Sequence, residues 1–298
     1  MSVVDPSTPL TVATGNLARR RRVDGMMRAS AMVAALLAVA ILVIVIISVA
    51  AQGAGQISIS FLTKDPVPLL GAAGGGIASA IVGSALIVAV ATAMALPIGV
   101  LIAIFLTEFS NPRTARPVRL ALDLLNGLPS IVIAVFVFGL LVAGHGQTGF
   151  AASFALAIIM VPLIARTTSE MLLLVPRELR DASHALGVSR WRTIVGIVLP
   201  SSLGGILTGV VLAIARAAGE TAPVLILCSI YGNSTTVDVF GTALPNIPME
   251  IFNGSESGFP ADHARAWGAA LVLIFFILVG NLSARALLAR QRRKVAGR

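Results

Sequence analysis

The segment from Pro176 to Pro223 reads PRELRDASHALGVSRWRTIVGIVLPSSLGGILTGVVLAIARAAGETAP and joins two different kinds of sequence. The first half, which ends at Pro200, is polar and basic. The second half is an apolar run that carries Arg216 and Glu220. The first half is typical of a docking segment outside a membrane, and the second of a functional segment within one. A protein that couples an event outside the bilayer to one inside it needs both.

The composition indicates an all-α integral membrane protein. Apolar residues make up 57% of the 298 residues, charged residues only 12%, and the mean hydropathy is +0.95. The net charge of +9 does not indicate a nucleic-acid-binding protein, because the basic residues form short clusters between apolar runs and no basic domain. The single cysteine, Cys228, excludes an internal disulfide framework.

Long apolar runs predict six transmembrane helices, each of roughly the ~20 residues that cross a bilayer. A polar tail at 1–29 precedes the first span at 30–51, which is too long for the ~7–15-residue apolar core of a signal peptide. The other spans are predicted at 77–107, 124–143, 149–164, 203–230 and 267–288. They make a core at 77–288, which contains a loop at 176–200 and is followed by a basic tail at 289–298.

The distribution of Lys and Arg tests this topology independently, because these residues concentrate on the cytoplasmic side. With a cytoplasmic N-terminus and six spans, all but three of the 22 basic residues lie in cytoplasmic segments. The exceptions are Lys64, Arg265 and Arg216, the last within the fifth span. An odd number of spans would scramble this partition. The sequence therefore predicts six spans with both termini in the cytoplasm.

Several catalytic patterns are missing from the sequence. There is no Gly-Lys-[Ser/Thr] triplet for nucleotide phosphates, no His-Glu-x-x-His zinc motif and no Gly-x-Ser-x-Gly nucleophile elbow. The three histidines are His145, His184 and His263, and they have no paired metal-ligand spacing. We therefore expect that the chain is not an enzyme and binds neither a cofactor nor a metal ion.

The polar half of the opening segment predicts a short amphipathic helix at 178–187. Leu179, Ala182, Ala185 and Leu186 share one face at helical spacing, and Gly187 fits a helix end. Two interpretations remain open at this point. The helix either docks on a partner protein or lies on the lipid surface.

The same residues resemble the EAA motif of ABC importer membrane subunits, in which E-A-A is followed after three residues by G and after nine more by I-x-L-P. The corresponding residues are Asp181, Ala182, Ser183, Gly187, Ile197, Leu199 and Pro200. The spacing is kept, with Asp in place of Glu and Ser in place of the second Ala. The resemblance implies a coupling helix that inserts into a groove of a separate ATPase subunit.

Three further blocks resemble the PstA-type permeases of phosphate-specific ABC importers: ALPIG at 95–99, GLPSIV at 127–132 and ARAAGETAP at 215–223. This resemblance implies a type I ABC importer permease fold in the bacterial cytoplasmic membrane. It also implies a sister permease subunit, two ATPase subunits that bind ATP and Mg²⁺, an extracytoplasmic phosphate-binding protein, and inorganic phosphate as substrate. The alternatives are an ABC importer permease for another small solute and a secondary transporter that works without ATP.

Arg216 and Glu220 are four residues apart, which places them on one face of a helix within reach of each other. An ionised group at the centre of a membrane helix costs roughly 2.5–3.5 kcal/mol, so both should face protein or water. In one interpretation the pair only neutralises itself and fixes packing. In the other it lines the phosphate route.

Small residues recur every four positions along the fifth span, at Gly205, Gly209, Ala213 and Ala217. Such a stripe lets helix backbones approach closely. We expect it to pack against the sister subunit or against a neighbouring helix of this chain.

Overall fold

The computed structural model describes residues 17–67, 71–72, 74–229 and 235–296, and these residues form helices without a β-strand. Three predicted segments extend outside the described residues: the N-terminal tail at 1–16, the C-terminal tail at 297–298, and the connection after the fifth span at 230–234. Residues 1–51 and residues 52–298 form two separate units.

The described residues of the first unit, 17–51, all belong to one helix, α1 (Leu17–Gly53). This helix contains the predicted first span at 30–51 but begins earlier, so residues 17–29 of the predicted tail are helical. Arginine is a good helix former, and Arg19 to Arg22 lie beyond the apolar stretch, where a helix can continue into water. Apolar residues from Met32 to Ile47 occupy all sides of the helix, as is typical of a membrane-spanning helix.

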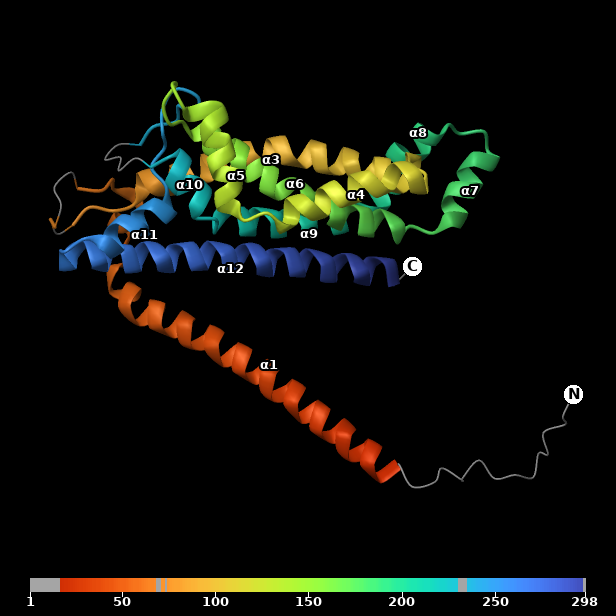
Figure 1. Cartoon of the computed structure of the whole chain (residues 1–298), viewed down its shortest axis with the longest axis horizontal. Coiled ribbons are helices and arrows are strands. Elements are labelled where there is room, and N and C mark those ends of the chain that lie inside the picture. Colours follow the sequence, from red (N-terminus) through yellow and green to blue (C-terminus); the bar gives the residue numbers. More distant parts are fainter. Residues whose placement is uncertain (1–16, 68–70, 73, 230–234, 297–298) are drawn as a thin grey trace, which may run out of the picture. The chain divides into compact units, whose positions relative to one another are not determined.

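Four long helices form the centre of the second unit and carry the predicted second, fourth, fifth and sixth spans. Helix α3 packs against α6, α6 against α9, and α9 against α12, and Figure 1 shows them running alongside one another. An added Cβ at Gly99 of α3 would lie 2.8 Å from Cγ2 of Ile164 in α6, so a small residue is needed where these helices meet. The four helices are α3 (Ala78–Ile104), α6 (Gly149–Leu173), α9 (Leu199–Ala218) and α12 (Pro260–Ala296).

Several of these helices extend beyond the predicted boundaries. Helix α3 continues as a π-helical segment, η2 (Phe105–Phe109). Helix α6 runs nine residues past the predicted end of its span, to Leu173, so Arg166 lies within the helix and not in a loop. Helix α9 follows α8 (Arg190–Thr193) and the π-helical segment η4 (Ile194–Val198).

The predicted third span at 124–143 is not one straight helix. Helix α4 (Pro112–Gly127) ends before Pro129, and α5 (Ser130–Val137) continues as the π-helical segment η3 (Phe138–Val142), bent by 98° from α4. Leu128 is extended, with φ −68° and ψ 134°. The ring of a proline disfavours helical geometry in the preceding residue, which explains the break.

The predicted fifth span at 203–230 is also interrupted. Helix α9 ends at Ala218, and a separate short helix, α10 (Ala222–Leu227), follows. Pro223 has no N–H to donate, and its ring would clash with the carbonyl four residues earlier in a continuous helix. Arg216 therefore lies in the last turn of α9, and Glu220 lies beyond its end.

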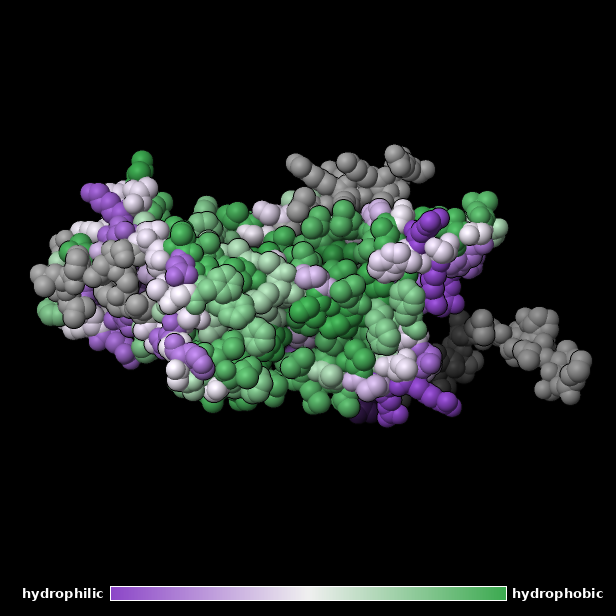
Figure 2. Space-filling view, turned by 90° about the horizontal axis from the view of Figure 1, so that it is seen from above, coloured by the Kyte–Doolittle hydropathy of each residue, from purple (hydrophilic) through white to green (hydrophobic). Residues whose placement is uncertain are grey.

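Shorter helices lie at the two ends of the central helices. Figure 1 shows α7 and α8 at one end, and α10 and α11 at the other. On the face seen in Figure 2, the surface between these ends is mostly hydrophobic, whereas hydrophilic residues gather at the two ends. This distribution is expected for a protein that crosses a bilayer. The short helices not yet bounded are η1 (Ala54–Gln56), α2 (Ile59–Thr63), α7 (Arg177–Ala185) and α11 (Ile247–Glu256).

Among the described residues, five helices are long and apolar enough to cross a membrane, or six if the bent pair of α4 and α5 is one span. This is an all-α, multi-pass membrane fold. The predicted six spans equal the higher of these counts, and the structure breaks the segments predicted as the third and fifth spans into separate helices.

Candidate functional site

Helix α7 (Arg177–Ala185) forms at the predicted amphipathic segment, and Gly187 follows two residues after its end. Gly187 has φ +75°, a left-handed conformation that glycine adopts without a Cβ penalty. The N–H of Gly187 donates to the carbonyl of His184 at 2.9 Å, and the N–H of Val188 donates to that of Ser183 at 3.1 Å. These two bonds form a Schellman motif, which satisfies carbonyls that the helix end would otherwise leave unpaired.

One face of α7 is held against the rest of the chain through Arg180. Its guanidinium donates to the carboxylate of Glu108 in η2 at 2.9 Å, and to the carbonyls of Val175 and Leu172 at 2.6 and 2.8 Å. Ser183 is buried on the same side, and its hydroxyl hydrogen-bonds that of Thr193 at 2.8 Å. The sequence analysis did not identify these anchors, because their partners are remote in sequence or are backbone groups.

Most of the surface of α7 is exposed. Leu179 and Leu186 are exposed apolar residues, Leu186 by 83%, and by helical spacing they lie on the same side of α7 as the buried Ser183. Among the residues that match the EAA motif, Asp181, Ala182, Gly187 and Pro200 are exposed, Ile197 and Leu199 are half-buried, and Ser183 is buried. The exposed surface of α7 thus combines two leucines with polar and charged residues.

The second candidate site lies where α9 ends. Nε of Arg216 is 3.7 Å from Oε1 of Glu220, with the Arg216 side chain 48% exposed and that of Glu220 19% exposed. The break between α9 and α10 does not separate these two residues, because Gly219 and Glu220 fold back through hydrogen bonds to the carbonyls of Arg216 and Ala217. The pair therefore opens to a surface and is not locked inside the helix packing.

Arg216 and Glu220 line a pocket of about 210 Å³ together with the residues at the break between α4 and α5. The pocket joins two sequence blocks that lie far apart in the chain, GLPSIV at 127–132 and ARAAGETAP at 215–223. Asn126 and Ser130 supply its other polar groups, which the sequence analysis did not identify. The signal that could have found them is Gly127 followed by Pro129, which predicts a helix break at membrane depth.

The two glycines of the small-residue stripe on α9 face α6 of the same chain. An added Cβ at Gly205 would collide with the side chain of Met171, and one at Gly209 with that of Thr167. Ala213 and Ala217 are each 1% exposed. Gly205 and Gly209 therefore lie against a neighbouring helix of this chain, which is one of the two expected locations.

No group of three or more His, Cys, Asp or Glu side chains is arranged to hold a metal ion among the residues with described positions. Cys228, the single cysteine, is fully buried beside Leu244. The polar side chains that line the pocket at the end of α9 are those of Arg216, Glu220, Asn126 and Ser130.

Comparisons with known proteins agree with this architecture. Residues 95–297 match the family model of the binding-protein-dependent transport system inner membrane component. The phosphate transport system permease protein PstA 1 of Mycobacterium tuberculosis (strain CDC 1551 / Oshkosh) is 43% identical over 212 residues, which cover 70% of this chain and 69% of that protein. The PstA protein of Xylella fastidiosa (strain Temecula1 / ATCC 700964) is 35% identical over 95% of this chain and 99% of its own.

A solved structure has the same fold. A chain of the MetNI methionine ABC transporter in an inward-facing conformation superposes with a TM-score of 0.54 at 19% sequence identity, over 71% of this chain and 95% of that one. At this identity the likeness concerns the fold alone. The helical architecture, the match over residues 95–297 and the relatives of 35% identity and above lead to one conclusion: the chain belongs to the family of binding-protein-dependent transport system inner membrane components.

Proposed function

We propose that this chain is the membrane subunit of an ATP-driven importer of inorganic phosphate, and that phosphate passes the pocket lined by Arg216 and Glu220. The observation that carries the proposal is the convergence of the two PstA-like blocks at 127–132 and 215–223 on this single pocket. The relatives reported above are named phosphate transport system permeases, which supports phosphate as the substrate class.

The geometry of the pair suits a transient anion site. A guanidinium offers a planar fork of donors that matches phosphate oxygens. The 3.7 Å contact to Glu220 is long, and the half-exposed Arg216 side chain keeps donors available to a ligand. Glu220 competes with phosphate for the same donors, and this competition keeps the anion from being held too long.

The remaining parts of the importer belong to partner chains in this proposal. ATP and Mg²⁺ bind to two ATPase subunits, on which the exposed face of α7 docks. A sister permease subunit completes the route, and an extracytoplasmic binding protein delivers phosphate. The chain then lies in the bacterial cytoplasmic membrane with both termini in the cytoplasm. Exposed apolar residues at α7, a helix that Arg180 attaches to Glu108, support the docking role.

Uptake of labelled phosphate by the reconstituted complex tests the proposal. Arg216→Gln removes the charge but keeps similar length and hydrogen-bonding capacity, so uptake per assembled complex should fall about tenfold or more, the loss expected for a hydrogen bond to a charged group. Arg113→Gln is the matched control, because Arg113 is exposed on α4 and does not line the pocket. Glu220→Gln should also lower uptake, by leaving Arg216 unopposed.

A purely structural pair gives a different pattern. Each single variant then loses assembled complex, and the Arg216→Gln/Glu220→Gln double variant regains it. Near-normal uptake per complex in Arg216→Gln would reject the transport role. Uptake by the purified chain without an ATPase subunit would favour a secondary transporter, and uptake of other small solutes in preference to phosphate would favour a different importer.

A further inference from the structure

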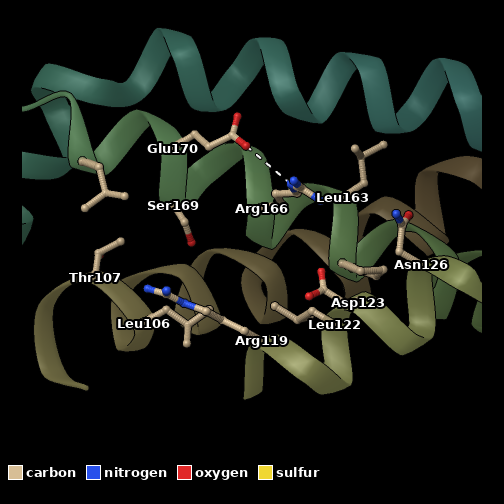
Figure 3. A pocket seen from close by; sticks show the side chains of 12 residues that line it. Leu106, Thr107, Arg119, Leu122, Asp123, Asn126, Leu163, Arg166, Ser169 and Glu170 are labelled. Atoms are coloured by element: carbon tan, nitrogen blue, oxygen red, sulfur yellow. Dashed lines mark ion pairs between the residues drawn. The ribbon is translucent and has the colours of Figure 1, made fainter. Parts of the chain in front are cut away.

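A larger pocket lies between η2, α4 and α6, toward the end of the central helices that carries α7 (Figure 3). Its volume is about 350 Å³, far above the ~15 Å³ that a cavity needs to hold one water. Four charged side chains line it: Arg119 and Asp123 from α4, and Arg166 and Glu170 from α6. The pocket is therefore roomy and polar enough to hold a small hydrated anion.

The charges in this pocket repeat the pattern of the Arg216 site. Arg119 and Asp123, Arg166 and Glu170, and Arg216 and Glu220 are all an arginine followed four residues later by an acid. Nε of Arg166 lies 3.5 Å from Oε1 of Glu170, close to the 3.7 Å of the Arg216 pair, and both side chains of the Arg166 pair are more than half exposed. Figure 3 shows Arg119 extending away from Asp123 along the pocket. Each arginine thus has donors available to a ligand.

Neighbouring pockets share lining residues along α4. Asn126 lines both the pocket of Arg216 and the pocket of Arg166. Arg119 and Asp123 line the latter and also a third pocket, of about 590 Å³, which reaches Arg116 near the start of α4. The three pockets therefore follow one another along α4, from the Arg216 pocket toward η2, where Glu108 binds Arg180 of α7.

We propose that Arg119 and Arg166 form a second anion station, which receives phosphate from the Arg216 pocket and releases it at the α7 end. This inference rests on the proposed function. Passage requires sites that bind strongly enough to admit an ion and weakly enough to let it leave. Glu170 beside Arg166 and Glu220 beside Arg216 meet this requirement, because each competes with the anion for the donors of its arginine. Two arginines from different helices also supply forked donors to the same pocket.

Transport by the reconstituted complex tests this station. Arg119→Gln/Arg166→Gln should lower the maximal rate of phosphate uptake about tenfold or more per assembled complex, as loss of charge-assisted hydrogen bonds predicts. The phosphate concentration at half-maximal uptake should change little, because the anion reaches this station only after it has entered. Arg113→Gln serves as the control, since Arg113 lies on α4 but lines none of the three pockets.

If the wild-type complex imports phosphate and the Arg119→Gln/Arg166→Gln complex imports it as fast as the Arg113→Gln complex, the station is overturned while the proposed function stays intact. A wild-type complex that imports no phosphate would overturn the proposed function itself, and the station with it.

A chemical probe tests occupancy directly. Ser169 lines the pocket, so Ser169→Cys introduces a thiol at the station. The native Cys228 is fully buried and should not react with a thiol reagent in the folded protein. Inorganic phosphate should slow the reaction of this introduced thiol with a thiol reagent in the assembled complex. Adding Arg119→Gln/Arg166→Gln should abolish this protection. Equal modification rates with and without phosphate in the Ser169→Cys variant alone would contradict the proposal.

Discussion

The guanidinium of Arg180 lies 2.9 Å from the carboxylate of Glu108, although the two residues are 72 positions apart. Their side chains are only 17% and 8% exposed. Arg180 also donates to the carbonyls of Leu172 and Val175, at and just beyond the C-terminal end of α6, where the last turn of a helix leaves its carbonyls without intrahelical partners. A single side chain thus fixes α7 to both α6 and η2.

We expect Glu108→Gln to weaken the attachment of α7, because removing one partner of a shielded ion pair leaves an uncompensated charge and costs about 3–5 kcal/mol when the pair is fully buried. Substrate-stimulated ATP hydrolysis by the assembled complex should fall, since the docking face of α7 is no longer held in one orientation. Arg177→Gln is the control, because Arg177 is exposed on the same helix. Equal stimulation in both variants would contradict this role for the pair.

Gly187→Asp should uncouple ATP hydrolysis from transport without removing the protein from the membrane. The φ of +75° at Gly187 strains any residue with a Cβ, and an added Cβ has no neighbour within 4 Å in this chain. A clash of the Cβ itself must therefore come from a partner. Gly187→Ala separates the effects, because it keeps the backbone strain but adds little bulk. Full phosphate-stimulated ATPase activity in Gly187→Asp would exclude docking at this helix end.

Gly209→Leu should destabilise the chain by about 1–3 kcal/mol or more, the usual cost of overpacking. The new side chain would collide with Thr167 of α6. Gly196→Leu is the matched control, because no atom lies within 4 Å of an added Cβ there. The yield of purified protein and its apparent melting temperature should fall for Gly209→Leu and not for Gly196→Leu. Similar values for the two variants would show that α9 and α6 tolerate separation.

The end of the molecule that carries α11 should be less stable at higher pH. Burial raises the pKa of the Glu250 carboxyl from its ordinary 4.5 to about 7, against an opposing effect of Arg265. The folded protein therefore holds this proton over a pH range in which the unfolded chain has lost it. Protonation of Glu250 therefore stabilises the folded protein fully below about pH 4.5, and this stabilisation is lost as the pH rises through 7. Its full contribution to the free energy of unfolding is about 3 kcal/mol.

Glu250→Gln imitates the protonated carboxyl and should flatten the fall of the apparent melting temperature between about pH 5 and pH 8, the range around the raised pKa. Arg265 keeps an acidic partner in this variant, because its Nη2 lies 3.3 Å from Oδ1 of Asp262. Glu256→Gln, at an exposed position of the same helix, should leave the pH dependence as it is. A slope that is unchanged in Glu250→Gln would exclude the carboxyl as its origin.

The sequence alone was enough for the membrane class, for a multi-pass chain and for the helix that Gly187 terminates. These features depend on local properties: hydropathy over about 20 residues, the side on which Arg and Lys lie, and the left-handed conformation that glycine permits. The resemblance of residues 181–200 and 215–223 to ABC importer permeases rests on local motifs as well. Each of these signals lies within a short stretch of chain.

Only the tertiary structure placed Arg216 and Glu220 in a pocket with the α4–α5 break, joined Asn126 to the pocket of Arg166, and paired Arg180 with Glu108. Hydropathy treated 124–143 and 203–230 as continuous spans, because Pro129 and Pro223 interrupt backbone hydrogen bonding without lowering the apolar content. Which distant groups then meet depends on how α4, α6 and α9 pack, and packing is set by shape complementarity between helices and not by the periodicity of any one of them.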